Sequence, residues 1–144
     1  NGYRRKEPYT FCPTNNTWGY DNRSTAIRVI EGSEASTRLE KRDAGADCNP
    51  YLRIAADIAS GLDGLEQKIS PTKVTVGDAY KDKTSSLLPN SISEATSLAK
   101  NSKWLEDLLG QEMLKLCVQQ CERELDFFQK QVTEIELERY LNNL

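Results

Sequence analysis

The spacing of apolar residues predicts strands in the first third of the chain. Over residues 25–30 and 37–42, apolar and polar side chains alternate, and several are β-branched, which is typical of half-buried strands. A Glu-Gly-Ser sequence between the two segments has the composition of a turn. We therefore expect the two strands to form an antiparallel hairpin.

After residue 48 the period changes to that of amphipathic helices. Asn49 and Pro50 are suited to the cap and first turn of a helix, which we expect to run to about Ile69 and to stop before Pro71. The apolar positions that we expect this helix to turn toward the core are Leu52, Ala55, Ala56, Ile58, Ala59, Leu62, Leu65 and Ile69.

Residues 71–90 have no period and are expected to form an ordered loop. The helices beyond it are bounded by a capping box at Ser91–Glu94, a turn at Asn101–Ser102, a glycine at Gly110 and a second capping box at Thr133–Glu136. The long helix at 111–130 is expected to bury Met113, Leu114, Cys117, Val118, Cys121, Leu125 and Phe128. We therefore expect an α+β fold in residues 1–144, with strands and loops in 1–47 and helices in 48–144.

Composition excludes several classes of protein. The 144 residues carry a net charge of −3, which gives no general reason to expect nucleic acid or an anionic membrane as a partner. No apolar run is long enough to span a bilayer and no targeting signal is recognisable, so a cytoplasmic location is expected. Histidine is absent and no cysteine pair forms CxxC, so no zinc site is expected. The chain opens without Met, as an excised fragment would.

Charge is unevenly distributed along the chain. Residues 1–53 contain seven Arg and two Lys against seven acidic residues, whereas the rest has 10 basic and 15 acidic residues. Arginine, with its planar fork of donors, suits bidentate binding of phosphates or carboxylates. Scattered surface arginines are the alternative on composition alone.

The most informative row of charges lies in the second predicted strand. Arg38, Glu40 and Arg42 share one face because side chains repeat every second residue, and the hairpin would bring them near Arg28. A carboxylate between guanidinium groups stays ionised and can ligate Mg²⁺, while the arginines can hold anionic oxygens. A cross-strand salt-bridge ladder on a solvated face is the other interpretation.

A complete nucleotide site would need more than this row supplies. Divalent metals bound to a nucleotide require several carboxylates, and neither GxxxxGK(S/T) nor GxGxxG occurs. Further ligands would have to come from elsewhere.

Several segments resemble the glutamine synthetase family, in order and at matching spacings. The resemblances are of residues 1–8 to NSYKRLxP, 18–29 to W-x-x-x-N-R-S-x-x-x-R-(I/V), 37–52 to R-(I/L)-E-x-R…ADxNPYL, and 56–69 to A-x-x-x-A-G-L-x-G-I-x-x-K, with further matches at 77–80 and 88–91. The chain is thus identified as a member of this family, similar to the C-terminal part of its catalytic domain and to its γ-glutamylputrescine synthetase-like branch.

The resemblance implies an ATP-dependent ligase of nitrogen metabolism. In this family ATP phosphorylates the γ-carboxylate of glutamate, and ammonia or an amine then attacks the γ-glutamyl phosphate. Divalent cations, Mg²⁺ or Mn²⁺, neutralise the phosphates, and the full-length enzymes assemble as homo-oligomeric stacked rings. By motif position, the resemblance assigns Glu40 to the metal, Arg5 and Arg42 to glutamate, Arg28 and Arg38 to the nucleotide, and Arg23 to the transferring phosphoryl group as a catalytic residue.

One position departs from the family pattern. Ammonia-using members carry a flap glutamate three residues after the proline of NSYKRLxP, where this chain has Phe11. Phenylalanine cannot deprotonate ammonium. The departure leaves three possibilities: a ligase for larger amines, an ammonia user with a shifted flap, and a non-catalytic interaction or regulatory module. With one metal carboxylate, residues 1–144 alone are expected to be inactive.

Overall fold

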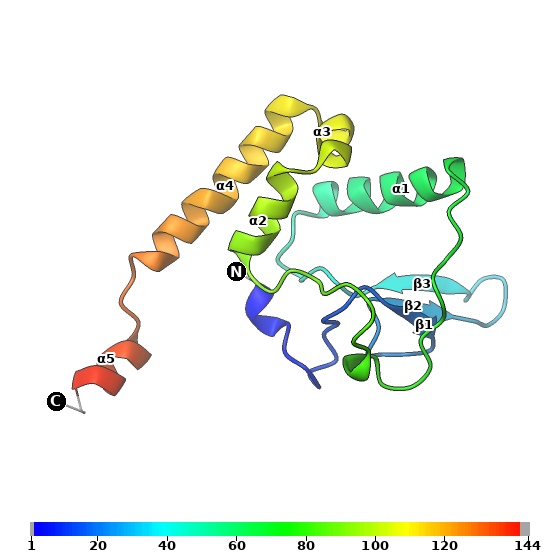
Figure 1. The fold of residues 1–144 in the computed structure, drawn as a ribbon, viewed down its shortest axis with the longest axis horizontal. Helices are drawn as coiled ribbons and strands as arrows, with labels where there is room; N and C mark the ends of the chain where they lie inside the picture. Colours follow the sequence, from blue (N-terminus) through cyan, green and yellow to red (C-terminus); the bar gives the residue numbers. More distant parts are fainter. Residues whose placement is uncertain (1, 142–144) are drawn as a thin grey trace. The chain divides into compact units, whose positions relative to one another are not determined.

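The computed structural model describes residues 2–141, and the chain divides into two compact units, Asn1–Ser91 and Ile92–Leu144. The first unit contains three strands, β1 (Trp18–Tyr20), β2 (Ile27–Ile30) and β3 (Arg38–Lys41), the helix α1 (Pro50–Glu66), and two short 3₁₀ helices, η1 (Gly2–Arg5) and η2 (Ala79–Lys81). The described part of the second unit contains the helices α2 (Ile92–Lys100), α3 (Lys103–Leu109), α4 (Gln111–Gln129) and α5 (Glu134–Leu141), as Figure 1 shows. Short strands followed by helices confirm the predicted α+β class.

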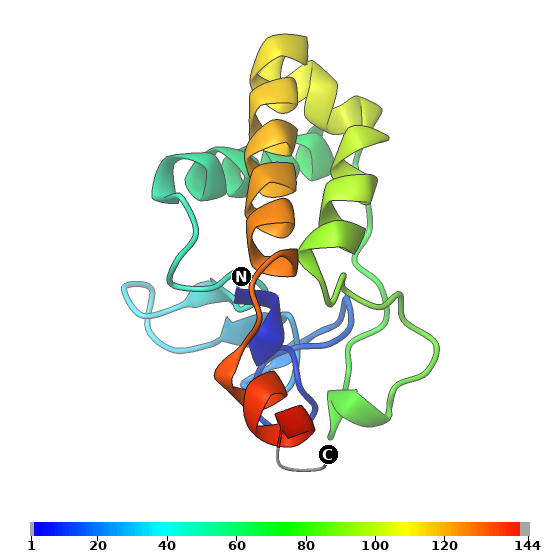
Figure 2. The same ribbon diagram turned by 90° about the vertical axis from the view of Figure 1, so that its left-hand side faces the viewer.

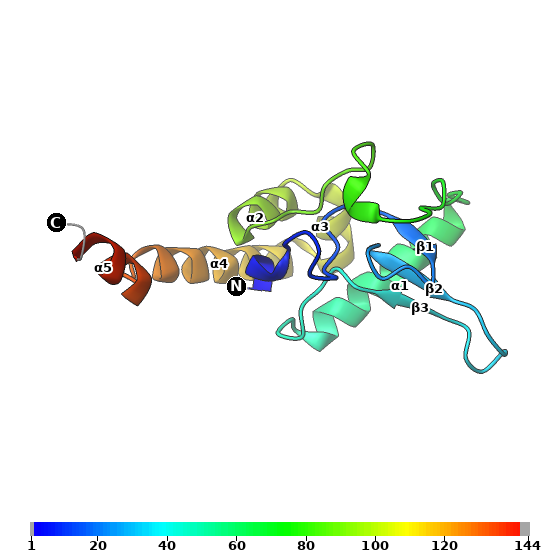
Figure 3. The same cartoon turned by 90° about the horizontal axis from the view of Figure 1, so that it is seen from below.

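The predicted hairpin is confirmed. Strands β2 and β3 pair antiparallel, with Arg28 opposite Glu40, and their connecting loop extends beyond the sheet in Figure 3. Strand β1 pairs parallel to the other edge of β2, with Trp18 opposite Ile27. The sequence analysis missed β1, because three residues are too few to establish an alternating pattern.

Helix α1 begins where predicted and ends slightly earlier. The side chain of Asn49 caps it by accepting hydrogen bonds from the amides of Tyr51 (3.0 Å) and Leu52 (3.3 Å). The helix ends at Glu66, and Lys68 then takes a φ of +53°. The chain therefore leaves the helical conformation three residues before Ile69, and Pro71 is not needed to stop it.

The prediction that α1 buries its apolar stripe is wrong. No α1 residue is buried, and the exposed fractions of Ile54, Ile58, Leu62 and Leu65 are 58%, 58%, 53% and 76%. The helix instead turns charged residues toward the strand region: Arg53 lies 3.2 Å from Asp43, and Lys41 of β3 lies 2.6 Å from Asp57. These ion pairs hold α1 beside the sheet (Figure 1) and leave its apolar face uncovered.

The interior of the first unit is small, and its buried residues include the polar Asn15, Thr17 and Thr25 beside Cys12, Ala26 and Ala79. Asn15 donates from Nδ2 to the carbonyl oxygen of Ala79 (2.7 Å) and accepts at Oδ1 from the Thr17 hydroxyl (2.8 Å). The indole of Trp18 donates to the carbonyl of Thr72 (2.8 Å). These bonds attach the segment after α1 to the N-terminal segment. The loop expected at 71–90 is therefore ordered, and it contains one short helix, η2, that was not predicted.

In the second unit, α2 and α4 lie side by side (Figure 2), and α4 buries Leu114 and Val118. Met113 and Phe128, expected to be buried, are 46% and 42% exposed. The nine residues of α2 span about 13 Å, less than half the length of the 19-residue α4, and leave part of α4 uncovered.

The helix boundaries of this unit follow local sequence signals. Helix α3 ends before Gly110, whose φ of +77° suits glycine, and α2 begins directly after Ser91. The second capping box is confirmed: the amide of Thr133 donates to Glu136 (2.8 Å), and the amide of Glu136 donates to the Thr133 hydroxyl (3.2 Å). Within residues 2–141, no helix has both the length and the apolar character to cross a bilayer.

Candidate functional site

A row of charged residues crosses β2 and β3. Arg28 donates from Nη1 to Oε2 of Glu40 (3.1 Å), and Arg38 donates from Nη2 to the other carboxylate oxygen (3.1 Å). Glu40 therefore lies between two guanidinium groups, as the sequence predicted. The flanking pair is Arg28 and Arg38, however. Among residues 2–141 the Arg42 side chain makes no hydrogen bond or ion pair with Glu40, so its place in this row stays a prediction.

This row fixes the ionisation of its carboxylate. Partial burial alone would raise the pKa of Glu40, but the hydrogen bonds and charges of Arg28 and Arg38 lower it below its ordinary value. The Nε atom of Arg28 also donates to Asp21 (3.0 Å). The hydrogen bond to Asp21 raises the pKa of Arg28; burial lowers this pKa, and the contact with Glu40 raises it further, so that the net shift is upward. Two cations and two anions balance, so the row carries no excess positive charge.

Arg42 belongs to a different set of contacts. Its Nη2 atom donates to the carbonyl oxygens of Phe11 (2.6 Å) and Arg23 (2.8 Å). Its Nε atom is buried and has no hydrogen-bond partner within the described part of the chain. A buried donor without an acceptor costs about 1–3 kcal/mol in general. Arg42 thus ties two loops together and keeps one donor unused.

The side chain of Arg5 contacts the main chain at Arg42 and Asp43. Its Nη2 atom donates to the carbonyl oxygens of Asp43 (2.6 Å) and Arg42 (3.4 Å), and its Nη1 atom contacts the Cys12 sulfur at 3.2 Å. Arg23 is exposed, and its side chain has no hydrogen-bond or ion-pair partner among residues 2–141. The predicted site residues therefore form two groups, Arg28–Glu40–Arg38 and Arg5–Arg42, with Arg23 joined to Arg42 by its carbonyl.

The donor set fits a divalent cation only in part. Glu40 is ionised and half-buried, and its oxygens suit a hard cation, although both now accept hydrogen bonds from arginine. No cluster of three or more His, Cys, Asp or Glu residues suited to a metal occurs over residues 2–141. Glu40 fits as one oxygen ligand, and the rest of a coordination shell would have to come from outside the described residues.

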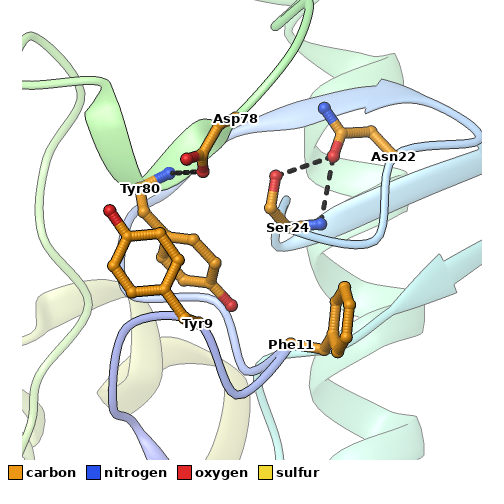
Figure 4. Close-up of a pocket in the computed structure, with 6 residues that line it drawn as sticks. All are labelled: Tyr9, Phe11, Asn22, Ser24, Asp78 and Tyr80. Atoms are coloured by element: carbon orange, nitrogen blue, oxygen red, sulfur yellow. Dashed lines mark hydrogen bonds between the residues drawn. The ribbon is translucent and has the colours of Figure 1, made fainter.

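A cavity of about 290 Å³ lies beside the segment that Arg42 holds (Figure 4). The residues that line it are Tyr9, Phe11, Asn22, Ser24, Asp78 and Tyr80. Apart from Phe11, the sequence analysis did not assign these residues to a site. Several fall within segments that match the family, but no sequence periodicity brings position 80 next to position 9.

Comparison with known proteins agrees with these features. Residues 1–140 match the family model described as glutamine synthetase, catalytic domain. The chain is 42% identical over 145 residues to type-1 glutamine synthetase 2 of Dictyostelium discoideum, covering 98% of this chain and 28% of that protein. It is 38% identical to gamma-glutamylethanolamide synthetase GlnA4 of Streptomyces coelicolor (96% and 30% covered) and 33% identical to gamma-glutamylputrescine synthetase PuuA of Escherichia coli (99% and 30%).

A solved structure, "GmaS/ADP complex-Conformation 1", superposes with a TM-score of 0.78 at 27% identity, covering 92% of this chain and 30% of that one. The chain spans less than a third of the length of each of these relatives. The match to the catalytic-domain model extends over almost the whole chain and includes both groups of arginines. The chain belongs to the glutamine synthetase family.

Proposed function

We propose that the full-length protein carrying this chain is an ATP-dependent ligase that joins the γ-carboxylate of glutamate to ammonia or an amine. The observation that carries the proposal is Glu40, held ionised between Arg28 and Arg38 at positions that the family resemblance assigns to metal and nucleotide. A cross-strand salt-bridge ladder would make the same contacts, so the proposal rests on them together with the motif positions.

The proposed reaction has two steps. An oxygen of the glutamate γ-carboxylate attacks the γ-phosphorus of ATP, which forms γ-glutamyl phosphate and releases ADP. The acceptor nitrogen, which as an ammonium first loses one proton to become the neutral amine, then attacks the γ-carbonyl carbon; the C–O bond to phosphate breaks, and the nitrogen loses a further proton. The products are an amide, ADP and inorganic phosphate.

The first group of residues serves the phosphates. Arg28 and Arg38 hold the nucleotide, and Glu40 contributes one oxygen ligand to a divalent cation, Mg²⁺ or Mn²⁺, which when bound supplies charge neutralisation for phosphoryl transfer. Arg23, whose side chain is exposed and unpaired among the described residues, is the catalytic arginine that stabilises the transferring phosphoryl group.

The second group serves glutamate. Arg5 and Arg42 are joined through the Arg42 carbonyl, and each guanidinium has five N–H donors, of which the contacts described above use only some. The unpaired buried Nε of Arg42 supports a role in holding a carboxylate, since an incoming acceptor would satisfy it after a small movement of the loop.

Assembly into a homo-oligomer is part of the proposal. The exposed face of α1 is apolar along its length, and a large apolar face of this kind is typical of protein–protein contact. The same observation supports the alternative function, a non-catalytic interaction or regulatory module derived from the family. Measured activity separates the two, because the module would assemble without consuming ATP.

The proposed chemistry is tested by isotope transfer. Glutamate labelled with ¹⁸O in its γ-carboxylate is incubated with the full-length protein, ATP and an amine, and the phosphate released is analysed by mass spectrometry. The proposal predicts one ¹⁸O atom per phosphate. Phosphate without label would contradict the γ-glutamyl phosphate step, and no phosphate release with any amine would support the interaction module.

A second expectation concerns residues 1–144 on their own. They supply one metal carboxylate, so we expect no glutamate- and amine-dependent phosphate release from the isolated chain. Turnover by the isolated chain would show that it contains a complete site.

A further inference from the structure

The cavity beside Phe11 has walls of two chemical kinds. Figure 4 shows the rings of Tyr9 and Tyr80 on one side, Phe11 facing them, and the polar residues Asn22, Ser24 and Asp78 along the upper edge. None of the described residues that line it is basic. A cavity with aromatic faces and a carboxylate favours a cation that carries apolar surface.

The two tyrosine rings contact each other, and hydrogen bonds hold the Tyr80 hydroxyl and the backbone at Phe11. The rings of Tyr9 and Tyr80 lie 5.2 Å apart at 54°, and the Tyr80 hydroxyl donates to the Cys12 carbonyl (3.0 Å). Tyr9 and Phe11 have φ angles of +66° and +58°, which non-glycine residues rarely adopt. Arg42 holds the carbonyl of Phe11, so the ring opposite the tyrosines is attached to a defined backbone.

Two of the three polar residues are already occupied by local hydrogen bonds. The Ser24 hydroxyl donates to Oδ1 of Asn22 (2.7 Å) and accepts from the amide of Ala79 (2.9 Å), and Nδ2 of Asn22 donates to the Gly77 carbonyl (2.7 Å). These groups form a rigid polar edge with no charge of their own. They leave recognition of charge to Asp78.

Among the described residues of the lining, Asp78 is the one that carries a charge. Its Oδ1 accepts from the amide of Tyr80 (3.0 Å), and its Oδ2 lies 4.0 Å from the exposed ammonium of Lys81, an ion pair that is weak at that distance and exposure. A carboxylate has about four acceptor positions, so Asp78 can cap η2 and also accept from a ligand.

We infer that this cavity holds the acceptor substrate and takes a protonated primary monoamine with an apolar substituent. The inference rests on the proposed ligase function and names the substrate class of that site. The ammonium group pairs with Asp78 and the aromatic faces, and the substituent packs between Phe11 and the tyrosines.

Size and charge define the substrate class further. A cavity of about 150 Å³ holds benzene, so one of about 290 Å³ has room for a branched alkyl group or a single ring. Ammonium would leave most of this volume to water. A diamine would bring a second positive charge, for which the lining formed by residues 2–141 offers no second carboxylate.

Equilibrium binding to the full-length protein tests the inference without depending on turnover. Calorimetry compares benzylammonium with ammonium, with 1,4-diammoniobutane and with the neutral isostere benzyl alcohol. Because Tyr9 and Phe11 are 71% and 63% exposed, the dissociation constant for benzylammonium is expected to be lower than for each of the others by roughly two- to fivefold, the effect of a cation against aromatic rings at an exposed site. Equal affinity for benzyl alcohol, or no binding of benzylammonium, overturns the inference.

Variants locate the binding. Phe11→Ala and Asp78→Asn are each expected to weaken benzylammonium binding roughly two- to fivefold, and Asp78→Asn keeps an oxygen for the η2 cap. Phe127→Ala is the matched control, since Phe127 is 58% exposed against 63% for Phe11 and lies outside the lining. Binding that neither Phe11→Ala nor Asp78→Asn changes overturns the inference.

Turnover separates this inference from the proposed function. If benzylammonium binds as expected but no glutamate-dependent phosphate is released, the ligase function fails and the cavity assignment stands as a binding site. If ammonia is ligated and benzylammonium is not bound, the ligase function stands and the cavity assignment is wrong.

Discussion

The Nη2 atom of Arg42 donates a 2.6 Å hydrogen bond to the carbonyl oxygen of Phe11, 31 residues earlier in the chain. The same nitrogen reaches the carbonyl of Arg23 at 2.8 Å. One guanidinium group thus connects the segment that lines the aromatic cavity with the turn that carries the proposed phosphoryl-binding arginine. In the proposed function, acceptor binding and phosphoryl transfer would share this connection.

Replacing Arg42 by Lys should therefore disturb the acceptor and glutamate more than ATP. Lysine keeps the charge but lacks the planar fork that reaches two carbonyls. Loss of a hydrogen bond to a charged group costs about 1.5–3 kcal/mol, so the KM values for amine and glutamate should rise roughly tenfold or more. Steady-state kinetics of the full-length enzyme measures this effect.

Arg38→Lys is the comparison variant, because Arg38 contacts Glu40 and belongs to the Arg28–Glu40–Arg38 group that is proposed to hold the nucleotide. Its KM for ATP should rise, and its KM for the amine should change little. A uniform rise in all three KM values for Arg42→Lys would indicate a general structural defect instead of the specific connection.

Glu40→Gln should weaken the response to divalent cations. The change keeps the shape and a hydrogen-bond acceptor but removes the charge that a cation needs. The Mn²⁺ concentration for half-maximal activity should rise at least roughly tenfold, as is common when metal-site partners are altered. Glu31→Gln, an exposed residue just after β2, is the control and should leave the value unchanged. An unchanged Mn²⁺ requirement in Glu40→Gln would remove Glu40 from the metal site.

Asn15→Ala should lower the free energy of unfolding. Asn15 is 2% exposed and bonds to both Ala79 and Thr17, so its loss leaves buried polar groups unpaired at a cost of about 1–3 kcal/mol. Asn16→Ala changes an exposed neighbour and should cost less than about 0.5 kcal/mol. Urea denaturation followed by tryptophan fluorescence compares the two variants. Similar losses in both would contradict the structural role assigned to Asn15.

Sequence reasoning succeeded where the structure depends on neighbours along the chain. Three such features depend on residues only a few positions apart: the helix cap at Asn49, the capping box of Thr133 and Glu136, and the β2–β3 hairpin. Alternation on β3 also placed Arg38 and Glu40 on one face.

The remaining features depend on contacts that leave no local pattern. Periodicity identified the apolar stripe of α1 but could not tell whether anything covers it, and Ile58 is 58% exposed. The bonds from Arg42 to Phe11 and from Asn15 to Ala79 end on backbone carbonyls, which every residue has. The aromatic cavity followed only from the folded chain, because Tyr9 and Tyr80 meet across the loop that follows α1.

Asp82 should stabilise the fold in a pH-dependent way. Hydrogen bonds from the Ser85 hydroxyl and from the amide and hydroxyl of Thr84 lower its pKa below the ordinary value. Because the pKa is depressed in the folded state, the stabilisation is fully present above the unfolded pKa of about 3.9 and is lost as the pH falls through the folded pKa.

The difference in unfolding free energy between the wild type and Asp82→Ala should therefore be constant from about pH 7 to 5 and shrink below about pH 4. Urea denaturation at a series of pH values measures it. A difference that stays constant down to pH 3 would show that Asp82 does not titrate as its hydrogen bonds require.

The ligase function is tested most directly by phosphate release from the full-length protein with ATP, Mg²⁺, glutamate and a panel of amines. Release should require both glutamate and an amine, be fastest with an apolar primary monoamine, and be weak with ammonia. Release that depends on ammonia alone would contradict the interpretation of Phe11, and the absence of glutamate-dependent release with every amine would contradict the ligase function itself.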